Sequence, residues 1–226
     1  MSPDDHVPFA SSHHVFSLSV LQAPIFSFTR LRGADPTLGV EMASTGEVAC
    51  FGEDSHQAYL QAMLSTPFKL PNKNRSILLS IASNEFRREF ADGVEILNRL
   101  GYKLYATPGT HKFYETNYGM TNLTCVTKPT DEADDGEGSA LRVIKDGLID
   151  LVINVSEGST RKDEVTAGYI IRRAVVDFGV SLVTDVKCAI KFAECMDRGW
   201  QDGKFEPRNV GEFYNLPTIG AFRKKP

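Results

Sequence analysis

Residues 76–106 read SILLSIASNEFRREFADGVEILNRLGYKLYA, and their pattern indicates the fold class. The apolar run at 77–81 predicts a buried strand. Apolar residues recur at helical spacing across 86–100, which predicts an amphipathic helix, and Gly101 is placed to end it. A second strand is expected at 102–106. Strand, helix and strand in this order form a βαβ unit, which is typical of α/β proteins.

The same alternation of strand and helix patterns continues to residue 196. The further elements that we expect are a helix ending near 118, a strand at 123–126, a helix at 139–146, a strand at 149–154, a helix at 165–178, a strand at 181–184 and a helix at 186–196. An acidic stretch at 131–137 is expected to be a solvated loop. Repeated βα units with apolar strands predict a mostly parallel sheet with helices on both faces.

The chain outside this alternation has weaker patterns. Residues 1–22 are rich in Ser, His and Pro and are predicted to be a disordered arm. Residues 23–70 combine interrupted strand patterns, a helix pattern at 54–65 and a proline-containing linker, and such a short β-rich piece cannot form a core alone. The main domain is expected at 71–199, followed by an irregular tail at 200–226.

The composition excludes several classes of partner and site. The 226 residues carry a formal net charge of -4, so we expect neither nucleic acid nor an anionic membrane as a partner. No apolar run approaches the roughly 20 residues that cross a bilayer. The four cysteines and five histidines lack ligand or CxxC spacing, so we expect reduced thiols and no metal site. No targeting segment is visible before Arg30, which favours a cytoplasmic location.

Candidate site residues follow the strands, because ligands of open parallel sheets collect beyond the carboxyl ends of the strands. The turn at 107–110, TPGT, has the features of a phosphate cradle. A helix N-terminus supplies unpaired N–H groups, Gly109 admits a close approach of the backbone, and Thr107 and Thr110 add hydroxyls. The alternative is that Thr110 only caps its helix.

Other polar side chains are expected near the same edge. Ser80 lies at the end of the first strand, and Ser156 follows the strand at 149–154. Asn154 closes an apolar run and is expected to face a ligand or a buried partner, the alternative being a backbone cap. Lys128 and Arg87 offer positive charge for a phosphate, the alternative being solvated surface cations.

Arg172 and Arg173 are predicted to lie outside this site. Asp177 follows them by five and four residues, a spacing that favours surface ion pairs on a helix. No Walker A, GxGxxG or GxSxG motif is present, so P-loop, dinucleotide and nucleophile-elbow sites lack their markers.

A series of short motifs marks the segment 24–52, namely FSF at 26–28, RL at 30–31, GADP at 33–36, LGVEM at 38–42 and STGEV at 44–48. They resemble the end of the second ATP-using half of the carbamoyl phosphate synthetase large chain, and residues 53–70 continue the resemblance into a linker. Residues 75–197 resemble the C-terminal allosteric domain of that enzyme. The resemblance implies a methylglyoxal-synthase-like, Rossmann-like three-layer sandwich with a mostly parallel sheet, preceded by a small β-rich remnant and a linker helix.

The resemblance implies a regulatory role. In this family the domain binds a nucleotide, phosphoribosyl pyrophosphate or N-acetylglutamate and relays its state to the synthetase core. The positions that match the effector contacts of the family are Ser80, Arg87, Thr107, Thr110, Lys128, Asn154 and Ser156, with one gap needed for Arg87. N-acetylglutamate-binding relatives and multifunctional animal relatives tend to carry Trp at the position of Lys128, so the resemblance favours a phosphorylated effector.

The two ATP-binding halves of the synthetase are absent from this sequence, so no catalytic residue and no cofactor are expected in it. ATP and Mg²⁺ would be used by the parent enzyme, whose synthetase core and glutaminase part are the implied partners. The pyrimidine and arginine pathways both stay open, as does the mitochondrial matrix if the parent carries a presequence. The alternatives are a methylglyoxal synthase-type lyase, with Glu137 near the position of its carboxylate but without its Gly-Gly-Asp motif, and a structural remnant without a ligand.

Overall fold

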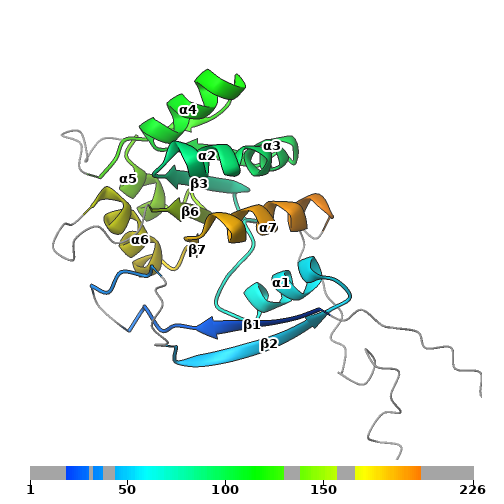
Figure 1. The fold of residues 1–226 in the computed structure, drawn as a ribbon. Coiled ribbons are helices and arrows are strands. Elements are labelled where there is room, and N and C mark those ends of the chain that lie inside the picture. Colours follow the sequence, from blue (N-terminus) through cyan, green and yellow to red (C-terminus); the bar gives the residue numbers. More distant parts are fainter. Residues whose placement is uncertain (1–18, 31–32, 38–43, 130–137, 157–165, 200–226) are drawn as a thin grey trace, which may run out of the picture.

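The computed structural model describes residues 19–30, 33–37, 44–129, 138–156 and 166–199 (Figure 1). Its main part is a five-stranded sheet in the order β5-β4-β3-β6-β7, in which every neighbouring pair is parallel. The strands are β3 (Ser76–Ile81), β4 (Lys103–Ala106), β5 (Thr124–Cys125), β6 (Leu151–Val155) and β7 (Ser181–Val183). The chain leaves β3 on one side through β4 and β5 and returns to its other side with β6. The strand order therefore reverses between β3 and β6, which is the switch point where such sheets bind ligands.

Helices cover both faces of this sheet (Figure 1). Leu79 and Ile153 contribute to one core with α3 and α7, whereas their neighbours Leu78 and Val152 contribute to a second core with α5 and α6. This alternation follows from the period of two in a strand. The helices are α1 (Ser55–Leu64), α2 (Asn84–Glu89), α3 (Ala91–Arg99), α4 (Pro108–Tyr118), α5 (Ala140–Lys145), α6 (Ala167–Asp177) and α7 (Val186–Asp197). The predicted three-layer α/β fold with a parallel sheet is confirmed.

The helix predicted at 86–100 is instead two helices, α2 and α3, with a break at Phe90. Ser83 caps α2 by accepting a hydrogen bond from the amide of Phe86, so the helical segment begins earlier than predicted. The backbone turns at Phe90, whose ring is fully buried, and Gly93 leaves room for that ring. Apolar spacing could not show the break, because Phe86, Phe90 and Val94 keep their helical hydrogen bonds across it.

A two-stranded antiparallel sheet precedes the sandwich, with β1 (Ser19–Ile25) paired to β2 (Gly46–Gly52). Strand β1 begins at Ser19, so its first four residues lie in the segment 1–22, which the sequence predicts to be a disordered arm. Pro24 argues against a helix, but proline is tolerated in an edge strand. The proline pattern therefore does not exclude β1. The remaining part of that arm, 1–18, and the tail at 200–226 lie outside the described residues.

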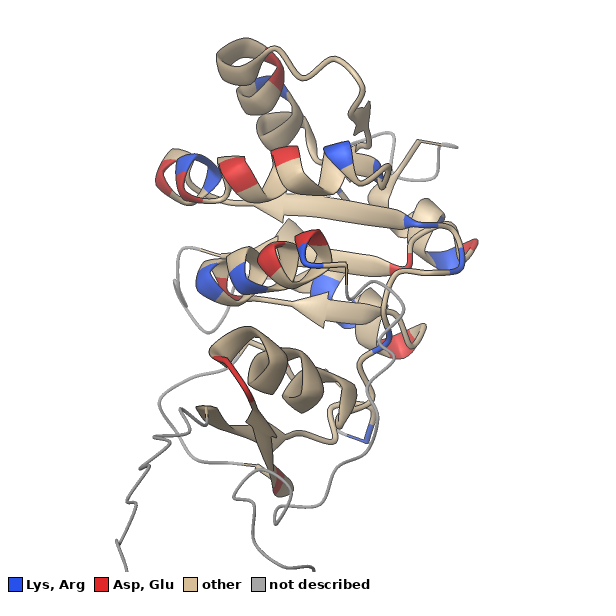
Figure 2. Cartoon of the chain, turned by 90° about the vertical axis from the view of Figure 1, so that its right-hand side faces the viewer, with Lys and Arg blue, Asp and Glu red and all other residues tan. Residues whose placement is uncertain are grey.

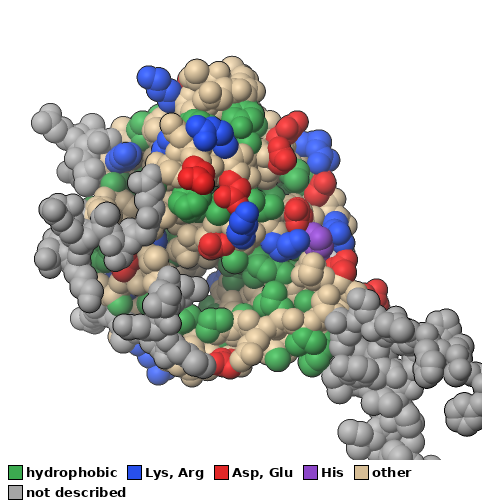
Figure 3. All heavy atoms as spheres, viewed as in Figure 1, with side chains coloured by type: hydrophobic (Ala, Val, Ile, Leu, Met, Phe, Trp, Pro, Cys, Tyr) green, Lys and Arg blue, Asp and Glu red, His purple; other side chains and the backbone are tan. Residues whose placement is uncertain are grey.

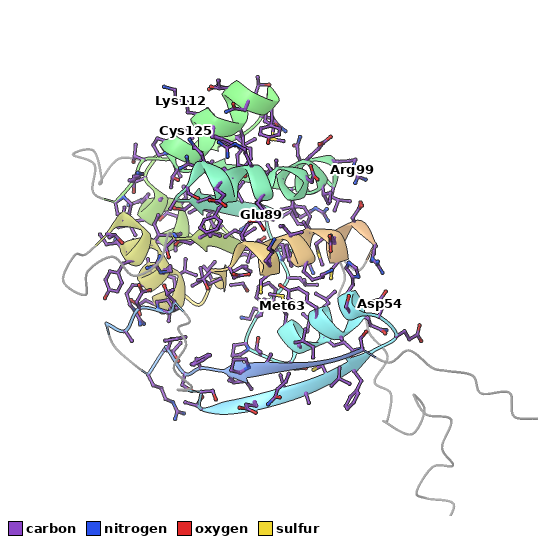
Figure 4. The ribbon with its side chains drawn as sticks, viewed as in Figure 1. Asp54, Met63, Glu89, Arg99, Lys112 and Cys125 are labelled. Carbon is purple, nitrogen blue, oxygen red and sulfur yellow. The ribbon has the colours of Figure 1, made fainter. Side chains whose placement is uncertain are left out.

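Helix α1 connects this small sheet to the sandwich. Asp54 caps its start by accepting hydrogen bonds from the amides of His56 and Gln57, and Asp54 and Met63 mark its two ends in Figure 4. The helix has no Lys, Arg, Asp or Glu along its length (Figure 2). Tyr59 is buried and donates a hydrogen bond of 2.8 Å to the carbonyl of Cys188 in α7. Uncharged α1 is thus packed between the β1–β2 pair and α7.

The visible face in Figure 3 shows the same division between the two parts. Hydrophobic side chains gather over α1 and the β1–β2 pair, below a band of charged side chains over α2, α3 and α7. An ion pair between Lys187 and Glu89 crosses that band, and another joins Arg99 to Asp197 at 2.8 Å. Of the helices described, none is both long enough and apolar enough to cross a membrane.

Gly52 gives a test of how tightly β2 is joined to α1. A Cβ at this position would lie 2.4 Å from the backbone nitrogen of Ala58 and 2.8 Å from the carbonyl oxygen of Asp54. Because both are backbone atoms of the α1 start, we expect Gly52→Ala to lower the free energy of unfolding by about 1–3 kcal/mol. The control is Gly46→Ala in the same strand, where a Cβ meets no atom within 4 Å. Urea denaturation compares the two variants, and equal midpoints would contradict the tight junction.

Candidate functional site

Polar side chains gather at the carboxyl ends of β3, β4 and β6, beside the switch point. Ser80 of β3 lies opposite Asn154 of β6 in the parallel register. Thr107 directly follows β4, and Ser156 directly follows β6. Asn154 and Thr107 are buried, whereas Ser80 and Ser156 are half-buried. The structure brings these four predicted residues to one edge of the sheet.

The hydroxyl of Thr110 is hydrogen-bonded to the backbone of β3. Thr110 is fully buried, accepts a hydrogen bond of 3.1 Å from the amide of Ile81 and lies 3.2 Å from the carbonyl oxygen of the same residue. Its helix α4 starts at Thr107 without a side-chain cap. Thr110 therefore neither caps the helix nor offers an open hydroxyl, and it instead ties the start of α4 to the end of β3.

Arg87 lies beside the start of α4 rather than in open solvent. Its guanidinium donates to the carbonyl oxygens of Ile81 at 3.0 Å and Ala82 at 3.1 Å and to the side chain of Asn84 at 2.6 Å. A Cβ at Gly109 would lie 3.1 Å from its Nη2 atom. The guanidinium is thus held at the turn that the sequence predicts to be a phosphate cradle.

Lys128 lies beside the edge strand of the sheet, two strands away from β3. It is exposed and follows β5, the strand beyond β4 in the sheet order. The adjacent Thr127 pairs with Ser139 at the start of α5 through an isolated parallel bridge. The backbone beside Lys128 is therefore anchored, while its side chain extends from the loop.

The prediction that Arg172 forms a surface ion pair is wrong. Its side chain is 5% exposed, and it donates to both carboxylate oxygens of Asp35, at 2.7 and 2.5 Å, and to Oδ1 of Asn154 at 2.8 Å. Arg173 does pair with Asp177, at 2.5 Å, as predicted. The two arginines are neighbours in α6, so a rotation of about 100° per residue turns one inward and leaves the other near the surface.

Gly168 is a sequence signal for the buried arginine. Gly168 precedes Arg172 by four residues, which places it one helical turn away on the same face. A Cβ at Gly168 would lie 3.1 Å from Nη1 of Arg172 and 3.7 Å from Oδ1 of Asn154. A glycine one turn before an arginine thus makes room for the guanidinium to reach the strand.

Asn154 presents an unused donor at the switch point. A guanidinium only donates hydrogen bonds, so the amide oxygen must be the atom that faces Arg172. The other amide atom, Nδ2, is buried and has no hydrogen-bond partner among the residues that the structure describes. A buried donor without an acceptor costs about 1–3 kcal/mol, and a ligand with an acceptor group would remove that cost.

The remaining sequence expectations for the site concern a metal and an acidic residue. Within the described ranges, no group of three or more His, Cys, Asp or Glu side chains is arranged to hold a metal ion. Glu137, the residue nearest to the position of a lyase carboxylate, lies outside those ranges.

Comparison with known proteins identifies the domain. A family model described as MGS-like domain matches residues 89–184. Residues 89–184 are an MGS-like domain. Multifunctional protein CAD of Squalus acanthias is 46% identical over 186 residues, 78% of this chain and 8% of that protein.

Two further relatives are similar to most of this chain. Multifunctional protein URA2 of Saccharomyces cerevisiae is 42% identical over 199 residues, which is 87% of this chain and 8% of that protein. The mitochondrial carbamoyl-phosphate synthase (ammonia) of Aquarana catesbeiana is 44% identical over 176 residues, 78% of this chain and 11% of that protein. The chain therefore spans only a small part of the length of these curated relatives.

Thr110 provides a test of the junction between α4 and β3. Thr110→Val keeps the shape of the side chain but leaves the amide of Ile81 without its acceptor. Because that amide is buried, we expect the free energy of unfolding to fall by about 1–3 kcal/mol. Thr110→Ser keeps the hydroxyl and is the matched control. Chemical denaturation measures both variants, and a Val variant more stable than the Ser variant would show that the hydroxyl does not hold the junction.

Proposed function

We propose that the MGS-like domain is an allosteric regulatory domain that binds a phosphorylated small molecule, a nucleotide or phosphoribosyl pyrophosphate. The site is the strand-end edge with Ser80, Arg87, Thr107, Thr110, Lys128, Asn154 and Ser156, in which Thr110 holds the framework. The single observation that carries the proposal is the buried Nδ2 of Asn154 at the switch point between β3 and β6, which has no hydrogen-bond partner in the part of the chain that the structure describes.

Two features at the start of α4 favour an anionic ligand. The first amides of an α-helix have no partner within the helix and carry a partial positive charge. Gly109 lies in this first turn, and the guanidinium of Arg87 is held beside it. Positive charge next to free amides favours a phosphate group. Lys128, from the loop after β5, would add a further cation.

The regulated activity would be that of a synthetase core elsewhere in the intact protein, which would use ATP and Mg²⁺. The named relatives include multifunctional proteins and a carbamoyl-phosphate synthase. We therefore propose carbamoyl phosphate synthesis for pyrimidine or arginine metabolism as the controlled reaction, with that core and its glutaminase part as partners. The proposed location is the cytoplasm or the mitochondrial matrix, and the relative from Aquarana catesbeiana is named as a mitochondrial protein.

A thermal-shift titration tests the proposal, because a ligand that binds the folded state stabilises it by mass action. The probes are UMP, UTP, IMP, phosphoribosyl pyrophosphate and N-acetylglutamate. We expect one phosphorylated probe to raise the midpoint selectively, by the equivalent of about 2.7 kcal/mol at a concentration 100 times its Kd. A shift with N-acetylglutamate alone would contradict a phosphorylated effector, and no shift with any probe would favour a structural remnant. Methylglyoxal formed from dihydroxyacetone phosphate would favour the lyase.

Lys128 tests the anionic character of the site. Lys128→Ala removes one cation from an exposed loop, so we expect the Kd of the bound phosphorylated probe to rise about tenfold with no change in the free energy of unfolding. Lys145→Ala is the control, since Lys145 is an exposed lysine at the end of α5. Calorimetric titration of both variants measures the difference. Equal affinities in the two variants would remove Lys128 from the site.

A further inference from the structure

We infer that Arg172 is a positioning residue that couples the ligand contact at Asn154 to the segment 33–37, through Asp35. This set of three side chains, Asp35, Arg172 and Asn154, is called the Arg172 link. The inference rests on the proposed function, because it assigns a route by which a ligand at that site affects the part of the chain that precedes the sandwich.

The Arg172 link is a continuous chain of hydrogen bonds across two parts of the fold. Nη1 of Arg172 donates to Asn154 at the end of β6. Nε and Nη2 form a bidentate pair with the carboxylate of Asp35. The guanidinium is planar and rigid, so a displacement of Asp35 changes the direction of the bond to Asn154. One side chain thus ties a strand of the sheet to a segment far away in the sequence.

The Arg172 link also sets what Asn154 offers to a ligand. Because Arg172 occupies the amide oxygen, Nδ2 must point away from the guanidinium as a donor. A ligand therefore has to bring an acceptor, such as a phosphate or carbonyl oxygen. Without Arg172 the side-chain amide of Asn154 is free to rotate. It can then offer either its donor or its acceptor to a ligand. Arg172 in this way determines specificity without reaching the ligand itself.

The segment 33–37 is also held by two other residues of α6, the helix that carries Arg172. The hydroxyl of Tyr169 donates to the carbonyl oxygen of Gly33 at 2.8 Å, and Nη1 of Arg173 donates to that of Ala34 at 3.3 Å. Tyr169 precedes Arg172 by three residues and Arg173 by four, so both arginines lie about one helical turn from Tyr169. The segment thus follows any movement of this helix.

The negative charge of Asp35 is part of the Arg172 link. Burial raises the pKa of Asp35, but hydrogen bonds and the charge of Arg172, together with hydrogen bonds from Thr37, outweigh burial and leave the pKa below its ordinary value. Thr37 donates to the carboxylate through its amide at 3.3 Å and its hydroxyl at 3.0 Å. Asp35 is therefore ionised and fixed in position at neutral pH. Removing its charge would leave a buried guanidinium without its counter-ion, which is costly.

A stability cycle tests the link without any ligand. Asp35→Asn and Asn154→Ser are made singly and together, in the wild-type chain and in an Arg172→Met background, and urea denaturation gives each unfolding equilibrium constant. If Arg172 couples Asp35 and Asn154, the effects of the two substitutions on the unfolding equilibrium constant multiply in the Arg172→Met background. In the wild-type background the double variant deviates from that product by about fivefold. The same deviation in both backgrounds, or none in either, overturns the inference. Arg172→Lys keeps the charge and serves as the second variant if Met does not fold.

A second experiment measures the coupling to the ligand, with whichever of UMP and phosphoribosyl pyrophosphate stabilises the wild-type chain. Asp35 does not belong to the proposed binding site, yet we expect Asp35→Asn to raise the Kd of that probe about fivefold or more, because coupling acts equally in both directions. By the same reciprocity, the probe should slow hydrogen exchange of the amides at 33–37 in the wild type and not in Arg172→Met. The control is Arg142→Gln, an exposed ion-paired arginine of α5.

The outcomes separate the two proposals. If no probe binds the wild-type chain, the proposed function fails, and the stability cycle alone decides the Arg172 link. If a probe binds but Asp35→Asn matches Arg142→Gln in affinity and exchange at 33–37 does not respond, the Arg172 link is overturned while the proposed function stands. A loss of affinity and of the exchange response confined to the link variants supports both.

Discussion

Arg172 places a permanent positive charge where water hardly reaches it, and each of its N–H groups therefore needs an acceptor. Asp35 supplies two acceptors from outside the sandwich, and Asn154 supplies one from the sheet. The orientation of the Asn154 amide, the position of the segment 33–37 and the direction of the unused donor all follow from this one requirement. A pattern of hydrogen bonds around a single guanidinium thus connects the carboxyl end of β6 to the segment 33–37.

The architecture is predictable from sequence because its signals are local. Apolar strands followed by amphipathic helices predict a parallel sheet, and the confirmed fold has that sheet with helices on both faces. The break at Phe90 is missed because apolar spacing does not change there, and the ring of Phe90 turns inward only in the packed core. Strand β1 is missed because its pairing with β2 joins residues that are far apart in the sequence, which local periodicity does not report.

The positions of the candidate site residues in the fold are predictable from sequence, whereas their hydrogen-bond partners are not. Parallel strands share one carboxyl edge, so Ser80, Thr107 and Asn154 come together as expected. What each hydroxyl or amide does depends on its partners, and these come from other elements. The residue type and position of Thr110 suit a ligand contact, but its hydroxyl is hydrogen-bonded to the backbone of β3. The spacing of Arg172 suits a surface ion pair, but its side chain turns inward to Asn154.

The central position of β3 also bears on how the domain forms during synthesis. One edge of β3 pairs with β4 soon after both emerge, whereas its other edge waits for β6, which begins only at Leu151. At roughly 5–20 residues per second, that edge stays open for several seconds. An open apolar strand edge is a template for pairing with other chains. The half-finished sheet is therefore a stage at which nascent chains are exposed to misassembly.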